Sequence, residues 1–432
     1  MGNAQAVMEL MHDSNFTEIV RRAKSTSPLW EEFQTHPMPQ GYTALEAWSV
    51  LTAMRRQTAN VFPYPSYIFA EGPTEIWYDV NDTMRLLISE MQTTMRMADD
   101  VPADSQAGRF LSLKNIGSDL ASALECDGCP VDVARAYDII ARGSIPATPE
   151  EQVLGNAFGI LRKAHRYAKR SFSPWMFDDI QDMLEQGSGS LDVQPRIPQA
   201  SCTTIYKRMS DEETIERFCA ILNDLSSGKQ GDALAGFLLL AGIFRDISPL
   251  PRWNNVAILA MRHIFFAKMH MELLCNVPFG ALCLRWERGE RVAGVPYDWT
   301  SCNPDCGEGN DMSIHVQCYL QILHDALDSF VAELLRERSM EKPLDAAVAQ
   351  LKALNHRQQS VLREIAGEND HAPMSIDAHM KVFGIAYSTA RADLLALADA
   401  GYLVMETRGK KMLFSARPHL RETLLGTVVE RS

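Results

Sequence analysis

A polar loop between two apolar runs is the part of this 432-residue chain where residue types and spacing best support chemistry. Residues 233–244 are almost entirely apolar. Charged, amide and proline residues follow, and apolar residues return over 256–266. This pattern predicts a buried helix, a short loop and a second buried helix. Because the first backbone N–H groups of a helix have no partner within it, the start of the second helix is expected to attract an anion.

The loop residues 248–259 resemble the signature of the Fic (Fido) family, whose members mostly transfer AMP from ATP to a protein hydroxyl. That signature reads H-P-F-x-[D/E]-G-N-G-R-x-x-R and lies between two helices. Pro249 and Asn254 match it, and Leu250 is a conservative replacement. The resemblance implies a mainly α fold with a helical Fido-fold core. It also implies a small β-hairpin, expected near 196–206, that clamps the target segment.

The residues that carry the chemistry of the signature are replaced. Ser248 stands at the position of the general base, Arg252 at that of the metal-binding carboxylate, and Val256 and Leu259 at those of the phosphate-binding arginines. A serine hydroxyl has no useful basicity near neutral pH, and an arginine repels a metal ion. We therefore expect no catalytic residue in this loop and no AMP transfer by the usual mechanism.

These replacements do not exclude binding of an anion at the loop. Arg252 could neutralise a phosphate, whereas Trp253 and Asn255 replace glycines that let the backbone approach phosphates closely. One interpretation is a reshaped nucleotide pocket formed by Arg252, Trp253, Asn254 and Asn255, which would take ATP with magnesium. The other is a structural loop inherited from an enzyme, for which no cofactor is expected.

Three further segments resemble the family in the same order along the chain. Residues 121–125 are similar to the segment whose glutamate blocks the ATP site in self-inhibited members, and Glu125 matches that glutamate. Residues 150–156 resemble the helix that follows, and 311–313 resemble the start of the last core helix. The resemblance therefore covers roughly residues 30–420.

Composition predicts a globular cytoplasmic protein of two or three domains. The chain is 46% hydrophobic and 22% charged, as is usual for such proteins, and no apolar stretch has the length of a membrane span. The start lacks the basic region and apolar core of a secretory signal. Nine scattered cysteines, an odd number, indicate reduced thiols.

Two alternatives concern metal binding and a replacement base. Cys302, Cys306, His315 and Cys318 could in principle hold zinc, but their spacing is unusual for a zinc module. We favour a loop followed by a buried cysteine, and hence no metal. An active enzyme would need a new base, for which His263 is the nearest candidate in sequence.

Helical periodicity covers most of the chain. The expected helices are residues 4–22, 43–56, 81–97, 106–124, 131–141, 150–168, 176–186, 210–223, 233–245 and 312–338, with a short strand at 74–80. The expected domains are an N-terminal helical region that packs on the core (1–100), a Fido-like helical core (101–340), a linker (341–353) and a C-terminal domain (354–432).

The C-terminal domain has the pattern of a winged helix-turn-helix. Asn355 and Gln358 have the spacing of a capping box, Ser375 caps a second helix, and a third helix follows Ala386. Two strands joined by a basic turn are expected within 402–415. Three helices followed by such a hairpin are the order of a winged DNA-binding domain.

The third helix resembles the recognition helix of the winged domains that many Fic proteins carry. The matching residues, 389–394, read T-A-R-A-D-L. Residues 351–432 hold 11 basic and 9 acidic side chains, a balance of +2, whereas the whole chain carries −13. A basic wing on an acidic body suits contact with phosphates. The candidate DNA-binding residues are Tyr387, Ser388, Thr389, Arg391, Arg408, Lys410 and Lys411.

The preferred function is a regulatory Fic-like pseudoenzyme coupled to a DNA-binding winged helix of the transcription-regulator type. One alternative is an atypical AMP-transferring enzyme, a nucleotidyltransferase that acts on protein hydroxyls through a rearranged site. A purely structural interaction protein is a third. The expected partners are DNA or another protein rather than a membrane, and a homo-oligomer is expected because winged regulators commonly pair.

Overall fold

Helices make up most of the structure, a computed structural model, and two small antiparallel sheets complete it. The described residues are 8, 10–66, 74–98, 106–189, 191, 210–229, 231–292, 294–297, 311–367, 373–408 and 411–426. The predicted mainly α fold class is therefore confirmed. The chain divides into two compact units, of which unit 1 comprises residues 1–100 and 112–330, and unit 2 comprises residues 101–111 and 331–432.

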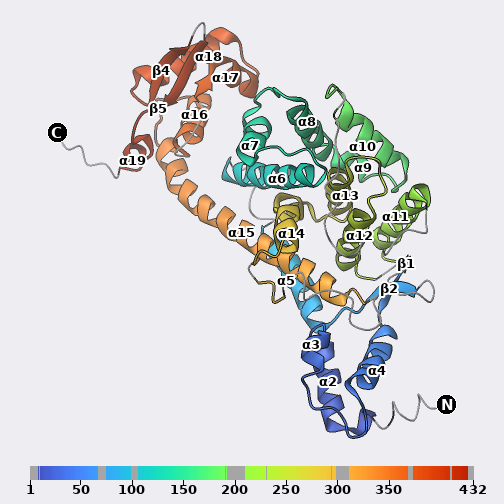
Figure 1. Ribbon diagram of the computed structural model, residues 1–432. Helices are drawn as coiled ribbons and strands as arrows, with labels where there is room; N and C mark the ends of the chain where they lie inside the picture. Colours follow the sequence, from blue (N-terminus) through green and yellow to red (C-terminus); the bar gives the residue numbers. More distant parts are fainter. Residues whose placement is uncertain are drawn as a thin grey trace. The chain divides into compact units, whose positions relative to one another are not determined.

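Most predicted helices of unit 1 lie close to their expected positions. The helix expected over 150–168 is divided into α8 and α9, and the one expected over 4–22 is interrupted at Asp13, which caps α2, while residues 1–7 and 9 lie outside the described residues. The elements, shown in Figure 1, are α2 (Ser14–Ser25), α3 (Trp30–Phe33), α4 (Ala44–Arg56), β1 (Asn60–Ser66), β2 (Thr74–Tyr78), α5 (Asp82–Ala98), α6 (Gln106–Cys126), α7 (Val133–Arg142), α8 (Pro149–Leu161), α9 (Ala164–Tyr167), α10 (Trp175–Glu185), α11 (Asp211–Ser226), α12 (Ala233–Ile247), α13 (Asn254–Lys268), η1 (Glu272–Asn276), α14 (Phe279–Glu287) and α15 (Ser313–Ala349).

One hairpin lies in the described part of unit 1. Strand β2, expected near 74–80, pairs antiparallel with β1, so that Asn60 lies opposite Tyr78. The hairpin expected near 196–206 falls outside the described residues. Among the described residues, no helix combines the length and the apolar character needed to cross a membrane.

The N-terminal helices α2, α3 and α4 share an apolar core of their own, in which Trp48 packs edge-on against Phe33. Hydrogen bonds connect the chain near this cluster to α15. The side-chain oxygen of Gln317 accepts from the Ser27 backbone N–H at 2.9 Å and from the Asn81 amide at 2.8 Å. These buried bonds hold the N-terminal segment to the start of the last long helix.

Helices α12 and α13 lie at the centre of unit 1. Helix α12 is apolar on almost every side, and such a helix is stable only when it is buried all round; residues 234–240 are all buried. Helix α13 packs against α8, α9, α10, α11 and α12. Stacked rings such as Phe177 on Phe244 and Phe237 on Phe265 join the helices. The loop between α12 and α13 is thus anchored at both ends by buried helices.

Unit 2 contains the predicted helices and strands in the expected order. Its elements are the end of α15, then α16 (His356–Gly367), β3 (Met374–Ser375), α17 (Ile376–Phe383), α18 (Tyr387–Asp399), β4 (Leu403–Arg408), β5 (Lys411–Ala416) and α19 (Leu420–Leu424), with the sheet order β3-β5-β4. The capping box is confirmed, because Asn355 and Gln358 exchange backbone-to-side-chain hydrogen bonds of 3.0 Å. Ser375 caps α17, whereas Ala386 gives α18 no side-chain cap.

The segment expected as a linker, 341–353, differs from the expectation. Helix α15 continues through Pro343 to Ala349, and the two units divide at residue 330 instead. The physical reason is that Leu344 and Val348, one turn apart, are buried in the apolar core of unit 2. Their burial stabilises the helix beyond the proline.

Candidate functional site

The loop between α12 and α13 turns at two residues with left-handed backbones. Ser248 ends α12 with a φ of +49°, and Trp253 precedes α13 with a φ of +59°. Residues with a Cβ atom adopt this region at a cost, which the surrounding structure must offset. Trp253 is 1% exposed, so burial of its large side chain offsets the cost at that position.

Asn254 closes this loop on itself. Its amide nitrogen donates to the Leu250 carbonyl at 2.8 Å, and its amide oxygen accepts from the Leu250 N–H at 2.9 Å. The Ser248 hydroxyl donates to the Arg245 carbonyl at 2.7 Å, which satisfies a carbonyl at the end of α12. Two of the polar side chains that the signature singles out therefore hold backbone groups of the loop.

The start of α13 does bind an anion, and the anion belongs to the protein. The carboxylate of Asp127, just after α6, accepts from the backbone N–H groups of Asn255 and Val256, each at 3.0 Å. It also accepts from the Asn255 side-chain amide at 2.8 Å. Burial raises the pKa of Asp127 to about 6, although these donors act to lower it.

The other two charged residues that the resemblance singled out form ion pairs away from the start of α13. Glu125, the match to the inhibitory glutamate, accepts from Arg288 at 2.7 Å, and Arg252 pairs with Glu185 at 3.1 Å. The carboxylate at the start of α13 therefore comes from two residues beyond the position that the resemblance indicates. Because an acidic residue is the usual partner of a helix start, the sequence indicated the kind of residue to expect there. It did not indicate which one, since Asp127 and Asn255 are 128 residues apart.

His263, the candidate replacement base, lies in the buried interior of α13 rather than at the loop. Burial lowers its pKa to about 3, and a group with so low a pKa is a poor base near neutral pH. His315 and Cys318 are buried on α15, while Cys302 and Cys306 lie outside the described residues. Across the described ranges, no three His, Cys, Asp or Glu side chains gather as metal ligands do.

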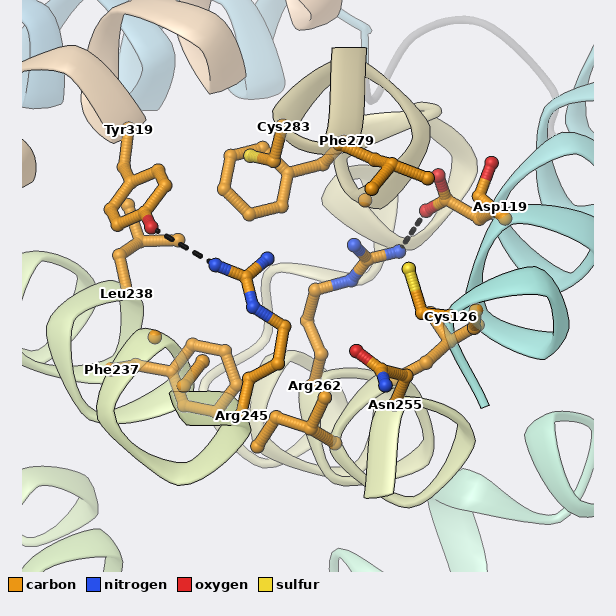
Figure 2. Close-up of a pocket in the computed structure, with 18 residues that line it drawn as sticks. Asp119, Cys126, Phe237, Leu238, Arg245, Asn255, Arg262, Phe279, Cys283 and Tyr319 are labelled. Atoms are coloured by element: carbon orange, nitrogen blue, oxygen red, sulfur yellow. Dashed lines mark hydrogen bonds and ion pairs between the residues drawn. The ribbon is translucent and has the colours of Figure 1, made fainter. Parts of the chain in front are cut away.

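A cavity of about 90 Å³ lies beside the start of α13, between facing sides of α6, α12, α13, α14 and α15. Figure 2 shows the guanidinium groups of Arg245 and Arg262 brought together from α12 and α13 at its centre. Arg262 pairs with Asp119 of α6, and Arg245 pairs with Glu287 at 2.5 Å and donates to the Tyr319 hydroxyl at 3.3 Å. Helical spacing explains the convergence, because residues 255, 258, 259 and 262 share one face of α13.

This cavity is not the predicted nucleotide pocket. Of Arg252, Trp253, Asn254 and Asn255, only Asn255 is among its lining residues, and the Asn255 amide already binds Asp127. Pockets for drug-sized ligands have volumes of about 300–1,000 Å³, several times that of this cavity. Sequence reasoning missed Arg245 and Arg262, although a charge within an apolar helical run signals a buried pair.

The predicted DNA-contacting residues of α18 lie in the first turns of the helix. Tyr387, Ser388, Thr389 and Arg391 are all exposed. Asp393 is buried instead, and accepts from Arg357 at 2.7 Å and from the Asn355 amide at 2.9 Å, so it fixes α18 to α16. For Arg408 and Lys411 the structure describes only the backbone, at the facing ends of β4 and β5, and Lys410 lies outside the described residues.

Comparisons with known proteins give a structural similarity only. No protein-family model matches the sequence, and no curated protein matches it. The crystal structure of a Fic family protein from Desulfovibrio desulfuricans G20 is similar to this structure, with a TM-score of 0.44 and 14% sequence identity. The similarity covers 79% of this chain and 97% of that chain.

Proposed function

We propose that this protein is a regulatory Fic-like protein that does not transfer AMP and that binds DNA through unit 2. The observation that carries the first part is the Asp127 carboxylate at the start of α13. A nucleotide phosphate approaching the same N–H groups would be repelled by this carboxylate and would have to displace it. Arg252, at the position where the signature holds a metal, is paired with Glu185 and cannot recruit magnesium.

The chemistry of the loop supports the same proposal. Transfer of AMP to a hydroxyl needs a base within hydrogen-bond reach of the attacking oxygen. Ser248 uses its proton on the Arg245 carbonyl, and His263 is buried with its pKa lowered to about 3. The core then serves as a rigid body whose loop geometry is held by Asn254 and Asp127.

ATP is expected to leave the thermal unfolding midpoint unchanged, with or without magnesium, because Asp127 holds the anion site. A ligand that binds only the folded state must raise this midpoint, so calorimetry with ATP, ADP and AMP measures the effect directly. Incubation with ATP labelled at its α-phosphate is expected to leave no label on protein. The Asp127→Ala variant is the matched comparison, since it frees the N–H groups of α13.

The outcomes of this titration are distinct. A midpoint rise with ATP in the Asp127→Ala variant alone would identify Asp127 as the group that excludes phosphate. No rise in either protein would assign the exclusion to the replaced signature residues. A magnesium-dependent rise in the unaltered protein, together with label transfer, would overturn the proposal in favour of the atypical nucleotidyltransferase.

The arrangement of unit 2 supports the DNA-binding part of the proposal. Helices α16, α17 and α18 followed by the β4–β5 hairpin have the order of a winged helix-turn-helix. Helix α18 carries an exposed polar face with Arg391 on it, and its buried side is fixed by Leu394 and Leu397. An arginine on such a face can donate two hydrogen bonds to a guanine.

Replacement of Arg391 by alanine is expected to weaken specific DNA binding by about 1–3 kcal/mol and to relax the preference at one base position. The site is first selected from random duplexes at fixed low salt, and affinity is then measured by fluorescence anisotropy. Arg363→Ala is the control, because it removes the same charge from a different helix. Arg363 lies on α16, where it pairs with Asp345. A two-fold repeat in the selected site would indicate a homodimer.

A failure of the whole protein to retain any duplex above the background of non-specific binding would overturn the DNA-binding part. Equal losses from Arg391→Ala and Arg363→Ala would show that only net charge matters, which contradicts recognition by α18.

A further inference from the structure

We propose that the cavity between Arg245 and Arg262 binds a small monocarboxylate, whose carboxylate lies between the two guanidinium groups and whose short hydrocarbon part lies on the apolar wall. Neither arginine belongs to the signature positions, and binding at this cavity does not depend on whether unit 2 binds DNA. The proposal rests on the unused donors, the apolar wall and the size of the cavity.

Both arginines present hydrogen-bond donors that the protein leaves unused. The Nε–H groups of Arg245 and Arg262 are buried and have no acceptor among the described residues. The Arg262 side chain is only 6% exposed. An unmade hydrogen bond to a buried charged group is costly, and a ligand that supplies acceptor oxygens would remove that cost.

The partners of the arginines hold them in place and are themselves engaged. Asp119 accepts from Arg262 and, with its other oxygen, from the Ala281 backbone N–H at 2.9 Å. Arg245 is held by Glu287, which does not line the cavity. The charged side chains on the cavity wall are Arg245, Arg262 and Asp119. With Glu287 beside Arg245, each guanidinium group has one counter-charge, so it is the unused N–H donors rather than a net charge that favour a ligand with acceptor oxygens.

The shape of the wall points to a carboxylate rather than to an inorganic ion. A guanidinium group offers parallel N–H donors that match the two oxygens of a carboxylate. Figure 2 shows the rings of Phe237 and Phe279 and the Leu238 side chain around the same space, and Ile258 also lines it. An apolar wall with few convergent polar groups is typical of a site for an organic ligand.

Size limits the ligand. A cavity needs about 10–15 Å³ of this kind of volume to hold one water molecule, so the roughly 90 Å³ here accommodates only a few heavy atoms. Short fatty acids such as butyrate are within this range, whereas a nucleotide is far too large. The chemical class is therefore a short-chain monocarboxylate.

Isothermal titration of the whole protein with acetate, butyrate and hexanoate, in a carboxylate-free buffer without DNA or nucleotide, tests the proposal. Butyrate is expected to bind at a single site, and at least about tenfold more tightly than butyramide, because hydrogen bonds between charged groups are stronger than those to a neutral amide. Phosphate and ATP are expected not to compete with butyrate.

Two kinds of variant locate the site. The double substitution Asp119→Asn with Arg262→Gln removes both charges of one buried pair, so that neither is left alone, and is expected to weaken butyrate binding by about tenfold or more. Ala123→Leu fills the cavity from α6 and is expected to abolish binding with every charge kept. The control is the double substitution Glu125→Gln with Arg288→Gln, which neutralises an ion pair outside the cavity wall. This variant is expected to bind butyrate as tightly as the unaltered protein.

Three results would overturn the proposal. The first is the absence of saturable binding by any of the carboxylates. The second is equal binding of butyramide and butyrate, which would remove the role of charge. The third is binding that survives Ala123→Leu in a protein whose thermal midpoint shows that it is folded, because the carboxylate would then bind elsewhere.

Discussion

Replacement of Asp119 by alanine is expected to lower the free energy of unfolding of unit 1 by about 3–5 kcal/mol. The Asp119 side chain is 2% exposed, and that of its partner Arg262 is 6% exposed. Removal of the carboxylate leaves a buried guanidinium group without its counter-charge and the Ala281 N–H without its acceptor. Loss of one partner of a buried pair is far more costly than loss of both, because a lone buried charge retains its full desolvation penalty.

Urea unfolding followed by tryptophan fluorescence measures this loss, since tryptophans such as Trp253 and Trp286 are buried in unit 1. Asp138→Ala is the matched control, because Asp138 forms a 2.9 Å pair with Arg142 in which both side chains are well exposed. Exposed pairs contribute about 0–1 kcal/mol. Similar small losses in both variants would show that water reaches the Asp119–Arg262 pair, and would weaken the argument for a buried arginine cavity.

Local sequence rules predicted most of the fold because their causes are local. The capping box of Asn355 and Gln358 depends on residues three apart, and helix α12 follows from an apolar run. The same rules were wrong about the end of α15, where burial of Leu344 and Val348 carries the helix past Pro343. Tertiary packing there outweighed the usual effect of proline.

The sequence predicted only part of the candidate site. An anion site at the start of α13 follows from the apolar–polar–apolar pattern, but its occupant, Asp127, is 128 residues away. Likewise, Arg262 within an apolar helix indicates that a buried partner must exist, yet nothing in the spacing selects Asp119, 143 residues away. Sequence thus identifies which polar groups need partners, while the three-dimensional packing of α6 on α13 decides which groups supply them.

The contribution of Asp127 to stability is expected to decrease as the pH rises from about 4 to about 6. Burial raises the pKa of Asp127 from 3.8 to about 6, so the folded protein binds this proton more tightly than the unfolded chain does. Lowering the pH through that window therefore favours the folded state. A shift of about 2 units corresponds to about 3 kcal/mol, fully lost above the folded pKa.

The difference in unfolding free energy between the unaltered protein and Asp127→Asn isolates this effect, because asparagine does not titrate. That difference is expected to fall by up to about 3 kcal/mol between pH 4 and pH 7. Asp182→Asn, at an exposed position on α10, is the control for general effects of charge. A difference that rises with pH would mean that the N–H groups of Asn255 and Val256 stabilise the carboxylate by more than burial costs. Because Asp127, with a pKa of about 6, is mostly ionised at neutral pH, its carboxylate opposes a phosphate at the start of α13 in either case. The sign of the change shows how strongly these two N–H groups hold it.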